Sequence, residues 1–331
     1  MTPKLSTRRC FLWLSVALLG GLMTPALAQA QDYPNRPVKI IVPFPAGGTA
    51  DAMPRVVADW LSRKWGQSIV IENRSGAGGN VGAEAAAKSD PDGYTLLSAP
   101  PPPLVINHNL YPKLGFNPLE FVPIIIMGRV PNALLVNPNN VQANSVPEFI
   151  ASAKARADKP YTSATQGNGT TSHLTSEMFR MMAGIKLQHV PYRGTAPALN
   201  DLVAGTCDIM FDNLGVSLQQ VKAGKLKLLG VASAKRLASL PNVPAIAETL
   251  PGFEAWAWFA LVAPPKTPPA IVAKINADVN EALRDPTIRK RFEEGFSAEI
   301  VGGTPQATAA YFREEVDRWH KIIKAAGVKL E

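Results

Sequence analysis

The segment 43–51 (Pro-Phe-Pro-Ala-Gly-Gly-Thr-Ala-Asp) holds the residues best suited to bind a small anion. It follows the apolar run Val38–Val42, which predicts a buried strand, and it opens a stretch of helical spacing that reaches Trp65. Ligands of open α/β sheets sit at the carboxyl ends of strands, and the glycine pair lets a ligand approach the backbone. The helix N-terminus behind it attracts carboxylate or phosphate. Ligand binding and a plain helix cap by Thr49 or Asp51 are equal alternatives at this point.

Three further polar segments follow predicted strands in the second half of the chain. Asn168–Ser172 is a run of small polar residues before a helix, and its hydroxyl and backbone N–H groups can clasp a second anionic group. The same reasoning applies to Tyr192–Thr195. Asp212 and Asn213 end a strand and can exchange hydrogen bonds with a ligand. A capped surface loop or a plain cap is the alternative at each place.

Other familiar kinds of site do not fit the sequence. The glycine-rich segment 76–82 has Val81 where the dinucleotide-binding spacing needs glycine, so its glycines are expected to shape a loop and to allow close helix packing. No Gly-x-Ser-x-Gly elbow is present. The histidines lack metal-ligand spacing and are interpreted as isolated structural or surface residues: His108, His173, His189 and His320. We therefore expect no cofactor, no metal and no catalytic group.

The elements that position these residues alternate between strand and helix. Further strands are expected over 68–71, 94–98, 160–163, 188–192, 207–211 and 226–232. Further helices are expected over 81–88, 146–156 and 198–204, with three more near 268–284, 286–295 and 305–326. A second strand–helix set begins after residues 133–138, and the apolar run 255–263 is expected to return to the first set. This alternation is typical of an α/β fold with mostly parallel sheet.

Length and composition exclude several classes of protein. The 331 residues are enough for about two domains, and 46% apolar with 18% charged residues is a globular composition, not a disordered or collagen-like one. The formal charge of +8 becomes +5 once the first 30 residues are set aside. No dense basic cluster with interleaved aromatics indicates nucleic-acid binding, whereas an anionic small molecule is compatible. Cys207 is expected to be a buried, inert thiol.

Residues 1–30 have the pattern of a secretory signal. Three basic residues precede the apolar run 11–22, and small residues offer cleavage sites near Ala28 or Ala30. The run is shorter than the about 20 residues of a membrane span. Ordinary and twin-arginine export both remain open. We expect the mature chain in the periplasm.

Several motifs resemble the substrate-binding receptors of tripartite tricarboxylate transporters, the Bug family. They follow one another along nearly the whole mature chain: Arg36–Asp51, Glu72–Asn80, Pro91–Leu96, His189–Gly194, Leu202–Asp212, Ala223–Leu226 and Leu240–Pro244. The resemblance implies an α/β, two-lobe periplasmic-binding-protein fold (type II, flytrap) with two mostly parallel sheets and a hinge of crossing strands. One departure is the stiff run of four prolines at 100–103, where a loop is expected to face the cleft.

The resemblance also implies lobe boundaries and a site. After the signal at 1–30, the first lobe comprises 31–138 and 254–331, and the second comprises 139–253. A proximal carboxylate site matches 44–51, opposed by the loop 163–172 and the turn 190–195. The expected ligand contacts are Phe44, Ala46, Gly47, Gly48, Thr49, Asp51, Ser98, Ser163, Thr165, Asn168, Thr170, Thr171, Tyr192, Thr195 and Asp212.

The function expected from these features is that of a periplasmic solute-binding receptor. It captures a small organic acid, a dicarboxylate or an aromatic carboxylate, between its lobes and delivers it to the membrane permease subunits of a tripartite transporter. We expect a monomer with no enzymatic activity and no nucleic-acid partner. The alternatives are an exported α/β enzyme acting on small carboxylates and a sensory module that presents bound ligand to a membrane kinase.

Overall fold

A ten-stranded sheet connects the two halves of the molecule. The computed structural model describes residues 33–328, so the predicted signal at 1–30 lies outside the described residues. The strands are β1 (Val38–Val42), β2 (Ile69–Asn73), β3 (Thr95–Ala99), β4 (Val122–Val136), β5 (Tyr161–Thr165), β6 (Leu187–Pro191), β7 (Ile209–Asn213), β8 (Lys227–Val231), β9 (Trp256–Ala263) and β10 (Glu299–Gly302). Their order is β2-β1-β3-β9-β4-β7-β5-β6, with β8 and β10 also paired to β4.

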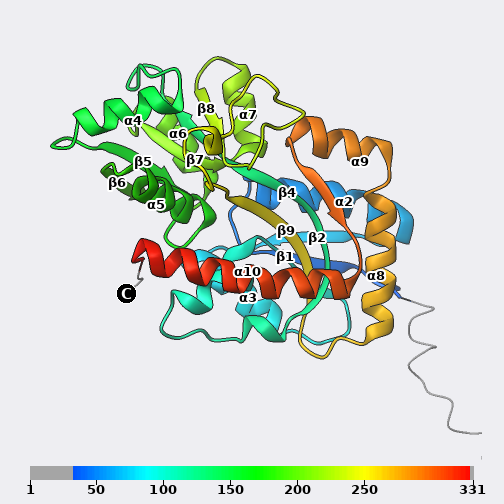
Figure 1. Ribbon diagram of the computed structural model, residues 1–331. Helices are drawn as coiled ribbons and strands as arrows, with labels where there is room; N and C mark the ends of the chain where they lie inside the picture. Colours follow the sequence, from blue (N-terminus) through cyan, green and yellow to red (C-terminus); the bar gives the residue numbers. More distant parts are fainter. Residues whose placement is uncertain (1–32, 329–331) are drawn as a thin grey trace, which may run out of the picture.

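Strand β4 joins the two halves of this sheet. Its first part pairs with β9 and β10, and its last five residues pair with β7. We call the half with β1, β2, β3 and β9 the first lobe, and the half with β5 to β8 the second lobe (Figure 1). In the described chain the parallel pairs lie within each lobe, and every antiparallel pair involves β4 or β9. The expected two-lobe α/β fold with crossing strands is confirmed, and its two sheets are continuous through β4.

Strand β4 is longer than the sequence pattern indicated. Pro123 and Pro131 have no N–H to donate to a neighbouring strand, and the pairing with β9 shifts register near Pro123 and again near Gly128. These breaks hide the strand in the sequence, although Ile124–Met127 is part of the core. The sequence located only the part of β4 that lies in the second lobe.

Most helices agree closely with the sequence expectation, which contained no helix over Leu214–Lys222. They are α2 (Thr49–Trp65), α3 (Asn80–Ala87), α4 (Val146–Ala155), α5 (Thr171–Ala183), α6 (Thr195–Ala204), α7 (Leu214–Lys222), α8 (Pro269–Ala282), α9 (Pro286–Lys290) and α10 (Pro305–Ala326). The proline run after β3 leads into a buried π-helical turn, Pro102–Ile106, because proline is tolerated where a helix begins and its missing N–H has no helical acceptor. No helix among residues 33–328 has the length and apolar character needed to cross a bilayer.

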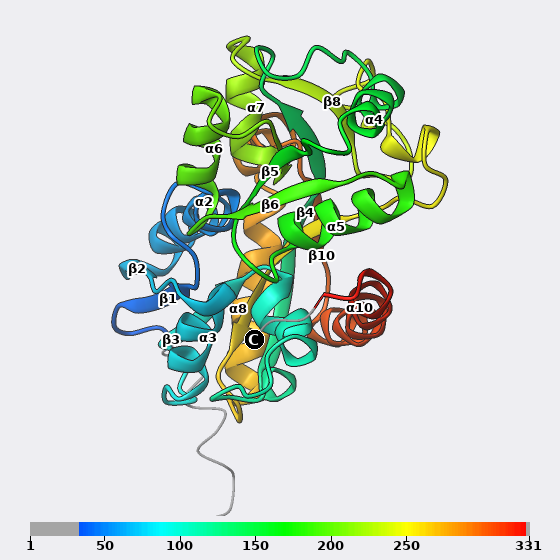
Figure 2. The ribbon, with the colours of Figure 1, turned by 90° about the vertical axis from the view of Figure 1, so that its left-hand side faces the viewer.

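Helix α10 connects the two lobes at one side of the molecule. It runs along the first lobe, and its C-terminal end reaches α5 of the second (Figures 1 and 2). Ile322 packs against the cores of both lobes. Glu315, which is buried, accepts hydrogen bonds from Trp258 Nε1 at 2.8 Å and Trp319 Nε1 at 3.0 Å. Since Trp258 belongs to β9, these bonds fix α10 on a strand that pairs with β4.

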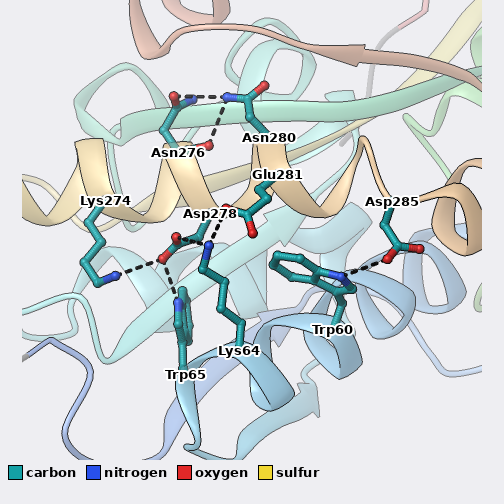
Figure 3. Close-up of polar contacts among 9 residues, drawn as sticks. All are labelled: Trp60, Lys64, Trp65, Lys274, Asn276, Asp278, Asn280, Glu281 and Asp285. Carbon is teal, nitrogen blue, oxygen red and sulfur yellow. Dashed lines mark hydrogen bonds and ion pairs between the residues drawn. The ribbon is translucent and has the colours of Figure 1, made fainter.

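Helix α2, which begins at the predicted anion site, is held in place by α8 (Figure 3). The buried Asp278 of α8 accepts a hydrogen bond from Trp65 Nε1 at 2.7 Å. Its two carboxylate oxygens lie 3.1 Å from Lys64 Nζ and 3.1 Å from Lys274 Nζ. Burial acts to raise the pKa of Asp278, but the hydrogen bonds from Trp65, Lys64 and Lys274 outweigh it and hold the pKa below its usual value.

Asp278→Asn is therefore expected to make the fold less sensitive to acid. A carboxyl with a depressed folded-state pKa stabilises the fold above its unfolded pKa, and this contribution is lost as the pH falls through the folded value. We expect the variant to lose about 1–3 kcal/mol of unfolding free energy at pH 7. Between pH ~5 and ~2 its stability should fall less steeply than that of the wild type. Urea unfolding at a series of pH values measures both effects, and identical slopes would contradict the role of Asp278.

Candidate functional site

Two adjoining cavities lie where the lobes meet. The outer cavity has a volume of about 500 Å³ and the inner one about 20 Å³. Phe44, Pro45 and Gln166 line both, so the two form one cleft. The first lobe contributes the loop 75–79 and Tyr111 to the outer cavity, and the second lobe contributes 166–168 and 191–194.

Four helices begin at the inner cavity. Gly48 precedes α2, Thr170 precedes α5, Thr195 opens α6 and Asn213 precedes α7, and all four residues line the cavity. The first turn of a helix leaves backbone N–H groups without helical acceptors and carries partial positive charge. Thr170 caps α5 by accepting from the His173 N–H, whereas α2, α6 and α7 have no side-chain cap. The inner cavity therefore presents donors and positive potential to an anion.

The lobes touch beside this cavity at positions where only glycine leaves enough space. A Cβ on Gly48 would lie 2.9 Å from Thr195 Oγ1, and a Cβ on Gly215 would lie 2.5 Å from Thr49 Oγ1. Thr49 Oγ1 also accepts a hydrogen bond from the Val216 N–H of α7 at 3.4 Å. The turn before α2 thus packs on the first turns of α6 and α7, and the structure is a closed form.

Some of the predicted ligand contacts line the cleft and others do not. Those that line it are Phe44, Gly48, Asn168, Thr170, Thr171, Tyr192 and Thr195. Those that line neither cavity are Ala46, Gly47, Thr49, Asp51, Ser98, Ser163, Thr165 and Asp212. Several of the second group hold the site together, because their polar atoms bond to neighbouring residues.

Asp51 supports the turn before α2 from behind. Its Oδ2 accepts from the Gly47 N–H at 3.2 Å, and its Oδ1 accepts from Arg55 Nε and Asn73 Nδ2, both at 2.9 Å. Asn73 Nδ2 also donates to the Phe44 carbonyl at 2.9 Å. Burial opposes ionisation, but the hydrogen bonds from Arg55, Asn73 and Gly47 hold the pKa of Asp51 below its usual value. The ionised carboxylate therefore fixes the turn that carries the inner-cavity glycine.

Two predicted hydroxyls of β5 are engaged inside the second lobe. Ser163 Oγ lies 2.8 Å from Ser176 Oγ, and Thr165 Oγ1 lies 2.7 Å from His189 Nε2. His189 stacks on His173 with ring centroids 4.0 Å apart, so these histidines form a pair and are not isolated as the sequence suggested. Burial lowers the pKa of His173 to about 3 and also lowers that of His189, which leaves both rings neutral at pH 7. Residues 33–328 hold no cluster suited to a metal ion.

Tyr192 lines the cleft, and its hydroxyl is hydrogen-bonded within the second lobe. The phenol donates to Asp201 Oδ2 at 2.7 Å and lies 3.2 Å from Cys207 Sγ. Burial, with Cys207 and Asp201 as neighbours, raises the pKa of Tyr192. Cys207 is buried, as expected, and burial raises the pKa of its thiol, which makes it a poor nucleophile.

The cleft also includes residues that the sequence did not single out as ligand contacts. They include Gly76–Gly79 and Tyr111 from the first lobe and Gln166 and Arg193 from the second, the last two within the expected segments 163–172 and 190–195. Gly79 has a φ of +96°, and a Cβ there would lie 3.2 Å from the Phe44 ring. A Cβ on Gly82 would lie 2.7 Å from the Arg74 carbonyl, so the expected close helix packing is also present. The spacing of the glycines in segment 76–82 was the one sequence feature that could have indicated these contacts. Such glycines let a ligand approach the backbone as readily as they let a helix pack against it.

Comparison with known proteins identifies the family of this chain. The model of the tripartite tricarboxylate transporter family receptor (TctC) matches residues 53–328. Protein BugT of Bordetella pertussis (strain Tohama I) is 36% identical over 314 residues, which cover 94% of this chain and 95% of that protein. A protein from the tcbD-tcbE intergenic region of Pseudomonas sp. (strain P51) is 36% identical over 307 residues, covering 91% of this chain and 90% of the relative.

Solved structures show the same fold. MatC (Rpa3494) from Rhodopseudomonas palustris with bound malate has a TM-score of 0.82 at 32% identity, covering 88% of this chain and 100% of that chain. R. palustris Rpa4515 with adipate has a TM-score of 0.87 at 38% identity, covering 90% of this chain and 99% of that chain. The sequence motifs, the two-lobe fold and these matches together show that the chain belongs to the tripartite tricarboxylate transporter receptor (TctC, Bug) family.

Proposed function

We propose that this chain is a periplasmic receptor that captures a small organic acid, a dicarboxylate or an aromatic carboxylate, and delivers it to the membrane permease of a tripartite transporter. The observation that carries the proposal is the convergence of four helix N-termini on the inner cavity. Relatives with adipate and with malate support a carboxylate ligand. The proposal includes export with removal of the signal, the lobe boundaries 31–138 with 254–331 and 139–253, and a monomeric state.

A carboxylate in this site is neutralised by backbone dipoles and hydrogen bonds. One helix N-terminus stabilises an anion by about 0.3–2 kcal/mol, and each charge-assisted hydrogen bond adds about 1.5–3 kcal/mol. Arg193 is exposed and lines the outer cavity, where it is placed to meet a second anionic group of a longer ligand. The hydrogen-bond donors of the inner cavity come from both lobes. Opening the lobes therefore removes part of the hydrogen bonding to the ligand, and delivery requires this weakening.

Binding without turnover fits the chemistry of the lining. The described lining residues provide glycines, prolines, hydroxyls, amides, aromatic rings and the Arg193 guanidinium. Hydrolysis of a small acid derivative needs a nucleophile activated by a nearby base. His173 and His189, which have the right chemistry for a base, line a different cavity beside α5 and the end of α10. These features favour a receptor over an exported hydrolase.

A thermal-shift screen of mono-, di- and tricarboxylates and aromatic acids tests the proposal on the mature protein. A ligand at about 100 times its Kd adds about 2.7 kcal/mol of stability, so at least one acid should raise the Tm by several degrees. The neutral amide of the same acid is the control and should give no shift. The bound acid should be recovered unchanged by NMR. Consumption of the acid, or equal binding of its amide, would contradict the proposal.

Gly215→Ala is expected to weaken binding without removing a ligand contact. The added Cβ would lie 2.5 Å from Thr49 Oγ1, so the lobes must separate to relieve the overlap. A ligand that bridges the lobes then binds more weakly, because part of its binding free energy is spent on closing them against this overlap. We expect Kd to rise ~10-fold or more. Calorimetry with an acid from the screen measures the affinity, and small-angle X-ray scattering of the complex measures the opening.

Gly295→Ala is the matched control for this variant. Its added Cβ would meet no atom closer than Arg291 Cγ at 3.7 Å, which is ordinary contact. It should bind like the wild type. If Gly215→Ala also binds like the wild type, the contact between Thr49 and α7 does not govern closure.

A further inference from the structure

The cleft contains one carboxamide whose orientation is set by a buried carboxylate. Gln166 lines both cavities and is 8% exposed, and its Nε2 donates to Asp212 Oδ1 at 2.6 Å. Asp212 lies on β7 with no exposed surface, and its Oδ2 has no hydrogen-bond partner among the described residues. Asp212, which the sequence predicted as a ligand contact, therefore lies behind Gln166 and outside the cavity lining.

The carboxylate decides which end of the Gln166 amide faces the ligand. Burial raises the pKa of Asp212 to about 6, so the group is ionised at pH 7.5 and can only accept hydrogen bonds. The amide nitrogen of Gln166 must then turn toward Asp212. The side-chain oxygen of Gln166 accepts no hydrogen bond from the described residues and is not buried. It is therefore left as an acceptor on the side where Gln166 meets the cleft.

This acceptor stands beside a cavity that otherwise offers donors. The helix N-termini and the hydroxyl of Thr195 suit carboxylate oxygens. A carboxylate oxygen placed against the Gln166 oxygen would bring two acceptors together, whereas a hydroxyl or N–H group there forms a hydrogen bond. A binding site that holds a polar side chain discriminates strongly against a ligand that cannot form a hydrogen bond to it, because the side chain is then left unpaired.

We propose that the Asp212–Gln166 pair sets ligand specificity, and that it selects organic acids carrying a hydroxyl or another hydrogen-bond donor near the carboxylate. This inference rests on the proposed carboxylate-binding function. Gln166 makes the contact, and Asp212 acts as a positioning residue. Family membership leaves the question open, because one solved relative carries adipate, which has no hydroxyl, and another carries malate, which has one.

Paired ligands test this directly in the wild-type protein at pH 7.5. Calorimetry compares malate with succinate, 2-hydroxyglutarate with glutarate, 2-hydroxyadipate with adipate, and mandelate with phenylacetate. In at least one pair the hydroxy acid should bind about 10-fold more tightly or better. If every pair that binds shows equal or tighter binding of the acid without a hydroxyl, the inference is wrong while the receptor function stands. If no carboxylate binds at all, the proposed function itself fails.

Two variants separate positioning from contact. Asp212→Asn keeps the shape of the side chain but lets the Gln166 amide adopt either orientation. The ratio of the affinities for the hydroxy acid and for its partner without a hydroxyl should therefore fall toward 1. The affinity for the partner without a hydroxyl should change little. Asp212→Asn combined with Gln166→Met removes the acceptor and should give a ratio near 1. Asp208→Asn, the same change at a half-buried carboxylate of the second lobe that lines neither cavity, is the control and should keep the wild-type ratio. If the double variant keeps the wild-type ratio of affinities, Gln166 and Asp212 do not set specificity. If the variants fail to fold, the paired-ligand calorimetry on the wild-type protein decides the question alone.

Discussion

The contact between the turn before α2 and the first turns of α6 and α7 is the interaction on which the rest of the structure depends. It brings the N-termini of helices from both lobes to one small space, where their unpaired N–H groups and dipoles reinforce one another. The approach is possible because Gly48 and Gly215 carry no side chain where Thr195 and Thr49 come close. A single geometric condition, closure of the two lobes, thus creates the proposed anion site.

The surrounding elements hold the helices in positions that allow the two lobes to close. Asp51 holds the turn before α2 through hydrogen bonds to Gly47 and Asn73, and Asp278 holds the far end of the same helix through Trp65. Strand β4 passes from one half of the sheet to the other and so fixes where the lobes are joined. Helix α10 packs along the first lobe and contacts α5 of the second, which limits how the lobes can move. Charges and buried hydrogen bonds therefore serve to place the backbone N–H groups to which we assign ligand binding.

The local pattern predicted the α/β class, and the family resemblance predicted the two lobes and the segments that face each other across the cleft. Neither could give the direction of the side chains. The alternation of short apolar runs with helical spacing predicted β1 and α2 with their observed bounds, because both follow from local pattern. Prolines and register shifts hid most of β4, whose identity depends on pairing with the distant β9. Thr165 ends β5 and Tyr192 directly follows β6, so both lie at strand ends, yet their hydroxyls turn to His189 and Asp201, partners that only the tertiary structure reveals. Gln166 lay within the expected loop 163–172 but was not named as a contact, because nothing local marks a glutamine whose amide is oriented by a carboxylate on another strand.

Amide NMR on the mature protein tests the central claim most directly. Addition of a carboxylate identified by screening should shift the backbone N–H signals of the first turns of α2, α5, α6 and α7 most strongly, since these groups hydrogen-bond to the ligand oxygens. Signals from Thr49, Thr171 and Thr195 lie at the inner cavity or directly beside it and report on three of these turns. If a tightly bound carboxylate leaves those signals unmoved and instead shifts residues elsewhere, such as the cavity between β10 and α10 around Arg129, the helix N-termini are not the anion site.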